Sequence, residues 1–233
     1  MNSEILEKGK INTKSISIKE ELYFGVKRTF DIIFSLIGLV FLVPVLIIVK
    51  ISYMLTGDFH SIIFKQERTG RYGKKFNLYK IRSMVAGNNV RDMSCEDKFT
   101  KVGRIIRKLS LDELLQVINI LKGDMSFIGP RPWIPEYYEN MNEKQRHRCD
   151  VRPGLSGLAQ VKGRNDISIF EKINYDLEYV KTCSVKTDIK IVFMTIKAVF
   201  GQKGVDAGKS TIHDEIEALK KQNRGTLNEK WSS

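Results

Sequence analysis

Residues 32–49 read IIFSLIGLVFLVPVLIIV, eighteen consecutive residues without a charge. A helix needs about 20 apolar residues to cross the hydrocarbon core of a bilayer, so this stretch predicts a membrane-embedded helix. It starts too late for a secretory signal peptide, and no small-residue cleavage site follows it. A buried core helix is the alternative, but apolar residues on every face are unusual in a small soluble domain.

Basic residues flank this stretch on both sides. Lys27 and Arg28 precede it and Lys50 follows it. Because Lys and Arg near the ends of a membrane helix favour the cytoplasmic side, charge on both flanks argues against a simple crossing. Pro44 removes a helix hydrogen bond and predicts a bend. We therefore expect a re-entrant membrane helix hairpin broken at Pro44, with a kinked crossing helix as the alternative.

The whole chain is basic. Its 233 residues include 39 Lys and Arg against 27 Asp and Glu, a net charge of +12, and residues 60–164 carry 21 against 11. This composition excludes an acidic or wholly disordered protein. A basic region beside a membrane helix favours anionic lipids or phosphorylated substrates, although a solvated cationic face is the simpler alternative. No nucleic-acid-binding motif occurs, so nucleic acid is not an expected partner.

Downstream of the apolar stretch, the pattern predicts an α+β, mainly helical fold. Short strands at 62–64 and 76–81 are expected to pair as a β-hairpin around a charged loop. Helical spacing predicts helices over 99–109, 110–121, 170–180 and 189–200, the last two amphipathic or interfacial. Residues 129–135 hold three prolines and 152–163 several glycines, so both are expected to be loops.

These patterns divide the chain into four parts. They are a polar N-terminal arm (1–26), the membrane-embedded helix (27–56), a small globular domain (57–207) and a mobile polar tail (208–233). Cys95, Cys149 and Cys183 have no CxxC spacing, so the sequence predicts neither a disulfide framework nor a zinc site.

Carboxylates and arginines are the candidate chemical groups, because no Walker loop, GxGxxG or GxSxG motif occurs. Ser110 and Glu113 have the S-x-x-E spacing of a capping box, so a structural role for Asp112 and Glu113 is one interpretation. The functional interpretation uses the same position. A helix N-terminus lowers the pKa of Asp112 and keeps it ionised as a nucleophile. Both carboxylates could also hold Mg²⁺ beside phosphate oxygens.

Cationic residues are candidates for binding phosphate. Arg131 lies between two prolines, which fix the backbone and present a planar guanidinium that suits phosphate oxygens. A rigid turn with a surface arginine is the alternative interpretation. Arg107 lies one turn before Asp112 and could bind the same anion, and Lys80 and Arg82 at a strand end are weaker candidates.

The glycine-containing segment from Arg152 to Arg164 is a further candidate. Gly154 could let the backbone approach a ligand closely, but glycines serve tight turns equally well. We therefore retain Arg152, Gly154 and Arg164 as residues near the substrate without assigning them a chemical role.

An ordered set of short motifs across about residues 22–205 resembles the bacterial sugar transferase family, the monotopic phosphoglycosyl transferases that act on polyprenyl phosphate. The motifs are Lys27-Arg28-x-x-Asp31, Phe64-Lys65-Gln66-Glu67-Arg68-x-Gly70, Tyr79-Lys80-Ile81-Arg82-Ser83-Met84, Ser110-Leu111-Asp112-Glu113-Leu114, Leu121-Lys122-Gly123-Asp124-Met125-Ser126, Gly129-Pro130-Arg131-Pro132, and Arg152-Pro153-Gly154 with Gly163-Arg164.

The resemblance implies a reaction. Asp112 would attack a UDP-sugar, UMP would leave, and polyprenyl (undecaprenyl) phosphate would take the sugar phosphate from the enzyme. Mg²⁺ would lie near Asp112 and Glu113, while Lys80, Arg107 and Arg131 match phosphate-binding positions. Such a step begins the assembly of exopolysaccharide, capsule, O-antigen or glycoconjugate at the cytoplasmic membrane, with the catalytic domain on its cytoplasmic face.

The resemblance also implies a membrane helix broken at a Ser-Pro pair, where this sequence has Val43-Pro44. Two alternatives stay open at this point. The lipid phosphate could attack the donor directly, with Asp112 and Glu113 holding metal, or the chain could be a basic membrane-anchored scaffold without catalysis. The sequence does not predict the sugar, and a homodimer stays open.

Overall fold

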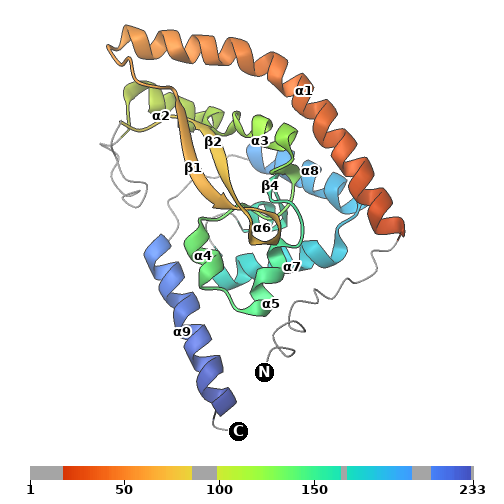
Figure 1. Cartoon of the computed structure of the whole chain (residues 1–233). Coiled ribbons are helices and arrows are strands. Elements are labelled where there is room, and N and C mark those ends of the chain that lie inside the picture. Colours follow the sequence, from red (N-terminus) through yellow and green to blue (C-terminus); the bar gives the residue numbers. More distant parts are fainter. Residues whose placement is uncertain (1–17, 86–98, 164–166, 201–210, 232–233) are drawn as a thin grey trace, which may run out of the picture.

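The computed structural model describes residues 18–85, 99–163, 167–200 and 211–231. Helices dominate these ranges, and two small two-stranded sheets lie among them. The mainly helical α+β class is therefore confirmed. Helix α1 (Ile18–Leu55) lies along one edge of the molecule, and Figure 1 shows a bend between its red and orange parts.

Pro44 lies inside α1 and does not divide it into two helices. The predicted hairpin, with a break at Pro44, is thus not seen as two separate arms. A proline removes one backbone donor, and a long helix accommodates this loss by bending while the flanking turns stay helical. Residues 18–26, assigned to the polar arm, form the first turns of the same helix.

Helix α1 has one face packed on the domain. The buried residues from position 31 onward are four or seven positions apart, which places them on one side of the helix: Asp31, Ser35, Leu42, Val49 and Tyr53. The opposite face exposes large apolar side chains, including Phe34, Val40, Phe41, Ile48 and Leu55. Within the described part of the chain, α1 is the one helix long and apolar enough to cross a membrane.

Strands β1 (Ile63–Thr69) and β2 (Lys75–Ile81) form the predicted antiparallel hairpin, joined through the short helix η1 (Arg71–Gly73). Ile63 pairs with Ile81 and Thr69 with Lys75. Leu78 and Ile81 are both buried but are three residues apart, so they face opposite sides of β2, and Lys80 lies on the same side as Leu78.

The segment after the hairpin holds α2 (Lys101–Lys108), η3 (Leu111–Glu113) and α3 (Gln116–Lys122). The single helix predicted for 110–121 is therefore a 3-10 turn followed by a short α-helix. The predicted capping box is wrong, because Ser110 has φ 54° and its side chain makes no capping hydrogen bond. Gly123, with φ 90°, ends α3.

A parallel pair, β3 (Ser126–Ile128) and β4 (Gly154–Ser156), lies beside these helices. The loop predicted for 152–163 instead contains β4 and α6 (Leu158–Lys162). The apolar residues Leu155, Leu158 and Ala159 are too few to show the periodicity of a strand or a helix. Between the two strands lie α4 (Pro135–Glu139), α5 (Glu143–Arg146) and η4 (His147–Cys149).

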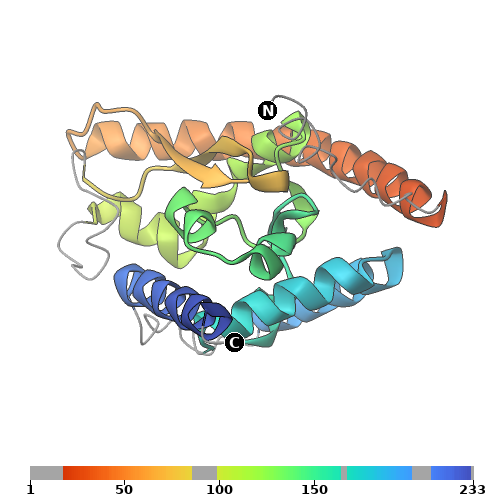
Figure 2. The ribbon, with the colours of Figure 1, turned by 60° about the horizontal axis from the view of Figure 1, so that its bottom comes forward.

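Three helices complete the fold: α7 (Ile169–Thr182), α8 (Val185–Phe200) and α9 (Ile212–Trp231). Figure 2 shows them below the hairpin and the short helices. The first turns of α1 reach α8, because Lys27 pairs with Asp188 at 2.6 Å. The prediction of a mobile tail is wrong for α9. Ile216 and Leu219 are three residues apart, and both are buried in a cluster with Tyr137 and Ile173.

Candidate active site

The two predicted carboxylates lie on a tight turn between α2 and α3. Ser110 adopts the left-handed conformation, with φ 54° and ψ 24°, and the 3-10 turn η3 follows at once. A residue other than glycine rarely adopts this conformation, which costs about 1 kcal/mol or more and concentrates at functional sites. The turn places Asp112 and Glu113 beside the end of β2 and the loop after β3.

Glu113 joins two of the predicted cations. Its Oε1 accepts a hydrogen bond from Arg131 Nη2 at 2.8 Å, and the Lys80 Nζ lies 3.7 Å from the same oxygen. Burial alone would raise the pKa of Glu113, but Arg131 and Lys80 together bring it below the ordinary value for a glutamate. Glu113 is therefore an anion that holds Lys80 and Arg131 in fixed positions.

Asp112 has a different environment from its neighbour. Within the described part of the chain, it forms no ion pair shorter than 4.0 Å with any Lys or Arg. Burial raises its pKa, while the charges of Lys80 and Arg107 partly offset that increase. The prediction that a helix N-terminus lowers this pKa is therefore wrong, because the residue lies in a partly buried 3-10 turn. Because none of the described cations pairs with Asp112, its ionised form keeps free lone pairs with which to act as a nucleophile.

Two further cations approach this pair. Arg107 on α2 stacks over the ring of Phe99, 4.9 Å from its centroid, and its charge lowers the pKa of Asp112. Arg68 on β1 donates to the carbonyl of Pro132 and to Gln66, and its Nε is a buried donor without a partner. Burial and the nearby Arg131 lower the pKa of Arg68 to about 10.

Burial also lowers the pKa of Lys80, although Glu113 opposes that effect. Lys80, Arg68, Arg107 and Arg131 thus surround two carboxylates. The group has an excess of positive charge, which an anionic substrate would neutralise.

Arg82 has other partners. It is buried, and its Nη2 forms a bidentate pair with Asp58 at 2.9 Å from each carboxylate oxygen. Its Nε donates to Ser61 O, and its ring neighbour is Tyr53. The structure therefore places this predicted phosphate ligand in contacts that join α1 to the end of β2.

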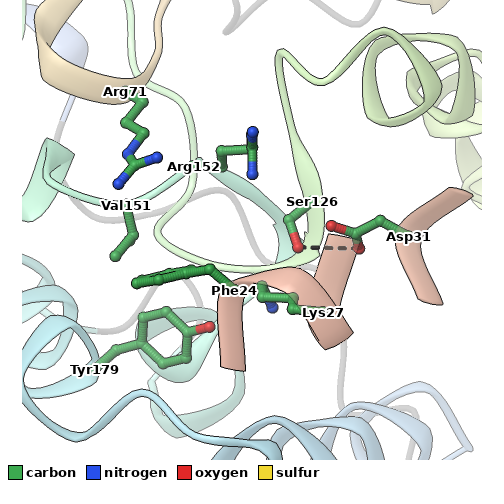
Figure 3. A pocket seen from close by; sticks show the side chains of 8 residues that line it. All are labelled: Phe24, Lys27, Asp31, Arg71, Ser126, Val151, Arg152 and Tyr179. Carbon is green, nitrogen blue, oxygen red and sulfur yellow. Dashed lines mark hydrogen bonds between the residues drawn. The ribbon is translucent and has the colours of Figure 1, made fainter. Parts of the chain in front are cut away.

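The three candidate residues of the 152–164 segment do not form one site. Gly154 packs against backbone: a Cβ there would lie 2.1 Å from Gly129 N. Its amide donates to Pro130 O at 2.9 Å, so Gly154 supports the loop that carries Arg131. Arg152 faces a separate pocket beside α1, shown in Figure 3. Arg164 lies outside the described residues.

Sequence reasoning did not assign a role to Arg68 or to the pair that supports the Arg131 loop. Arg148 donates to Arg131 O at 2.8 Å and to Asp176 at 2.6 Å, and it stacks over Trp133. The signal for Arg68 was its place in the motif at 64–70. No spacing links residues 148 and 176, which are adjacent only after folding.

The carboxylates fit a magnesium ion that takes few ligands from the protein. Among the described residues, no group of three or more Asp, Glu, His or Cys could hold a metal ion. Glu113 is already bonded to Arg131, so Asp112 is the freer of the two oxygen ligands. Mg²⁺ commonly binds one or two carboxylates plus substrate phosphates, and this pair satisfies that requirement.

Comparison with known proteins adds the family. The sequence profile of the family described as "Bacterial sugar transferase" matches residues 22–202. The uncharacterized sugar transferase EpsL of Bacillus subtilis (strain 168) is 41% identical over 185 residues, covering 77% of this chain and 90% of that protein. The exopolysaccharide production protein ExoY of Sinorhizobium fredii is 34% identical over 197 residues, covering 76% of this chain and 87% of that protein.

A longer relative is the undecaprenyl-phosphate galactose phosphotransferase of Salmonella typhimurium. It is 37% identical over 198 residues, which are 77% of this chain but 41% of that protein. The region that the family profile matches includes the hairpin, the Asp112–Glu113 turn and the Arg131 loop. The chain therefore belongs to the bacterial sugar transferase family and is an enzyme of the phosphoglycosyl transferase class.

Proposed function

We propose that this protein transfers a sugar phosphate from a UDP-sugar to undecaprenyl phosphate through a covalent intermediate on Asp112. An oxygen of Asp112 attacks the phosphorus that bears the sugar, and the bond from that phosphorus to UMP breaks. The acceptor phosphate then attacks the same phosphorus. The bond to Asp112 breaks, the carboxylate is restored, and undecaprenyl-diphosphate-sugar is released.

The contrast between the two adjacent carboxylates carries this proposal. Glu113 is bonded to Arg131 at 2.8 Å and lies near Lys80, whereas Asp112 has a raised pKa and forms no such pair. A nucleophile needs a lone pair that is not already shared with a strong donor. Asp112 meets this condition and Glu113 does not.

The cations supply the remaining catalysis. Phosphoryl transfer depends mainly on positioning and on stabilising charge, because the protein contributes little covalent chemistry. Lys80 and Arg131 are held by Glu113, so their positions are fixed before the substrate binds. They would bind the diphosphate and stabilise the charge that develops on UMP. Arg107 and Arg68 add positive charge around the same substrate.

Mg²⁺, when bound by Asp112 and phosphate oxygens with Glu113 nearby, would neutralise charge on the diphosphate. The nucleophile and the groups that bind the diphosphate are side chains of the protein itself. The names of three relatives support a lipid-carrier acceptor: the Salmonella protein above, a UDP-galactose-lipid carrier transferase of Erwinia amylovora and an undecaprenyl-phosphate glucose phosphotransferase of Komagataeibacter xylinus.

Contacts at both ends of α1 support a helix that enters the cytoplasmic membrane and stays on one side. Arg28 donates to Ile120 O at 2.6 Å, and Tyr53 donates to Arg82 O. At about 1.5 Å per residue, these two positions are roughly 38 Å apart along α1, more than the bilayer core of about 30 Å. A full crossing would draw the domain packed along α1 into hydrocarbon, so both ends are proposed to lie on the cytoplasmic face.

Labelling with a radioactive UDP-sugar tests the covalent step. The wild type should retain label after denaturation in the absence of acceptor and lose it when undecaprenyl phosphate is added. Asp112→Asn should retain none and lose turnover by about 10⁴-fold, because the nucleophile is removed. Normal labelling and turnover in Asp112→Asn would refute the assignment.

Two other outcomes identify the alternatives. Release of UMP with ternary-complex kinetics and no label would indicate direct attack by the lipid phosphate. No release of UMP from any UDP-sugar, with indifference to Arg131→Met, would indicate a basic scaffold protein. A panel of UDP-sugars scored by UMP release also identifies the donor.

Thiol labelling tests the membrane position. Gly25→Cys and Leu55→Cys lie near the two ends of the apolar face, and Lys122→Cys marks the domain. In intact spheroplasts, a membrane-impermeant maleimide should label none of the three above the wild-type background. Lysis should expose all three. Labelling of one helix end before lysis would show that α1 crosses the membrane.

A further inference from the structure

A second group of cations lies away from Asp112, in a pocket beside the first turns of α1. Figure 3 shows the guanidinium groups of Arg71 and Arg152 on one side of this pocket, with the rings of Phe24 and Tyr179 across from them. Asp31 and Ser126 form a third side and share a hydrogen bond of 3.0 Å. Arg71 comes from the hairpin turn, and Arg152 from the segment before β4.

Both arginines are held in a way that leaves their terminal nitrogens available. Arg71 Nε donates to Asp150 O at 2.9 Å, and Arg152 Nε donates to Gly123 O at 3.0 Å. Among the described residues, neither terminal nitrogen pair has a hydrogen bond, and neither arginine has a carboxylate within 4.0 Å. A guanidinium fixed through Nε keeps its two-pronged end for an oxyanion.

Positive charge accumulates here and is offset only in part by Asp31. Burial lowers the pKa of Arg152, the charges of Arg71 and Arg28 lower it further, and Asp31 opposes these effects. Lys27 also lines the pocket, but its ammonium is paired with Asp188 at 2.6 Å. An anion between Arg71 and Arg152 would remove the repulsion between them.

Asp31 supplies an independent observation. The residue is 4% exposed, and Oδ1 accepts hydrogen bonds from Ser126 and from the Phe127 amide. Its Oδ2 is buried without a partner, and the residue lines the pocket. A buried polar atom without a partner is costly, so an acceptor here indicates a ligand that also carries a donor, such as a hydroxyl.

The position of the pocket along α1 indicates the depth in the membrane at which its ligand would bind. Asp31 directly precedes the uncharged run at 32–49, and Lys27 and Arg28 lie one turn earlier. Residues at the end of a membrane-embedded apolar run lie at the level of the lipid phosphates.

We propose that Arg71, Arg152 and Asp31 form a binding site for a phosphate group, and that an anionic phospholipid with a hydroxylated head group supplies it. The two guanidinium groups bind the phosphate oxygens, and Asp31 accepts from the hydroxyl. The site is separate from the transfer reaction and would anchor the start of α1 at the membrane surface. Phosphatidylglycerol has this combination of groups, and free hydrogen phosphate has the same chemistry in soluble form.

Arginine modification in the full-length wild type tests the site without altering the fold. The protein is treated with phenylglyoxal in detergent, in detergent with inorganic phosphate, and in nanodiscs of phosphatidylglycerol or of phosphatidylcholine. Peptide mass spectrometry then gives the modification rate at Arg71, Arg152 and the exposed Arg146. We expect phosphate to slow modification about tenfold at Arg71 and Arg152, and to leave Arg146 unchanged.

The nanodisc arms distinguish the two sources of phosphate. Protection in phosphatidylglycerol nanodiscs without added phosphate, and not in phosphatidylcholine, supports the lipid. Protection that requires inorganic phosphate in every nanodisc keeps the site but overturns the lipid source. Equal rates at Arg71, Arg152 and Arg146 in all conditions overturn the site itself.

A variant series provides a second readout. Arg71→Lys and Arg152→Lys keep the charge but lose the planar fork, so each should weaken binding to phosphatidylglycerol vesicles about tenfold. Arg146→Lys is the matched control. Because Arg152 also holds the end of α3, each variant is first compared with the wild type by thermal unfolding. Lysine variants that fold and bind like the wild type would contradict the proposal. Labelling by UDP-sugar is followed in parallel, so that failure of this site and failure of the transfer mechanism are distinguishable.

Discussion

Two guanidinium–carboxylate pairs hold the Arg131 loop, and they differ in exposure. Arg148 and Asp176 are 2% and 1% exposed, 2.6 Å apart, and Arg148 also bonds to the backbone oxygen of Arg131. The Arg131–Glu113 pair has a similar distance, 2.8 Å, but the two side chains are 47% and 25% exposed. The buried pair fixes the backbone, whereas the exposed pair positions a side chain.

This difference separates structural from functional charge. A buried pair that loses one partner leaves an unpaired charge in a low dielectric, which costs several kcal/mol. A partly exposed pair contributes less, about 0–1 kcal/mol, because water screens the attraction between the two groups. A phosphate can therefore compete with Glu113 for Arg131 at little cost, while Arg148 stays with Asp176 throughout turnover.

The largest expected effect on the fold comes from breaking the buried pair. Asp176→Asn should lower the free energy of unfolding by about 3–5 kcal/mol, because Arg148 would remain buried without its counter-charge. Chemical denaturation in detergent measures this change. Lys221→Gln breaks an exposed pair with Glu217 and is the matched control. Equal effects of the two substitutions would refute the distinction between the pairs.

Breaking the exposed pair should affect catalysis more than stability. Arg131→Met should reduce kcat by about 10²–10³-fold, as expected when one charge-stabilising donor is removed. Its unfolding midpoint should stay within about 1 °C of the wild type, since exposed pairs add little. Steady-state UMP release and thermal unfolding measure the two effects. A large loss of stability with unchanged kcat per folded molecule would show that the Arg131–Glu113 pair is structural and not catalytic.

The sequence predicted those parts of the fold and of the site that short stretches of residues encode. The hairpin followed from alternation and from glycines near position 70, and Asp112, Glu113, Lys80 and Arg131 are brought together as the motifs indicated. The long apolar helix followed from its uncharged run, although its continuity through Pro44 did not. The parts that failed depend on contacts between distant segments.

Three failures show why. Asp176 approaches Arg148 only after α7 packs on η4, and no spacing records that contact. Arg82 was a weaker candidate for phosphate binding because of its place at a strand end, and its actual partner Asp58 lies 24 positions earlier, where no spacing records the contact. The pKa of Asp112 was expected to fall because the local pattern resembled a helix start. Burial by surrounding segments decided the direction instead.

The adjacent carboxylates should respond to neutralisation with opposite signs. Burial raises the pKa of Asp112, so its charged form opposes folding, and Asp112→Asn should raise the unfolding midpoint at neutral pH. Arg131 and Lys80 hold the pKa of Glu113 below its ordinary value despite burial, so Glu113→Gln should lower the midpoint. Thermal unfolding at neutral pH measures both. Shifts of the same sign would show that the two carboxylates share one environment.

The smallest expected effect is on the pH profile. Catalysis needs ionised Asp112, so the acidic limb of kcat/KM should lie above the ordinary pKa of an aspartate. The Arg107 charge lowers that pKa, and Arg107→Gln should therefore move the limb to higher pH. Arg104→Gln, exposed on the same helix, removes the same charge further from Asp112 and should move the limb less. If both variants move it equally, general surface charge sets the limb, and Arg107 has no specific effect on Asp112.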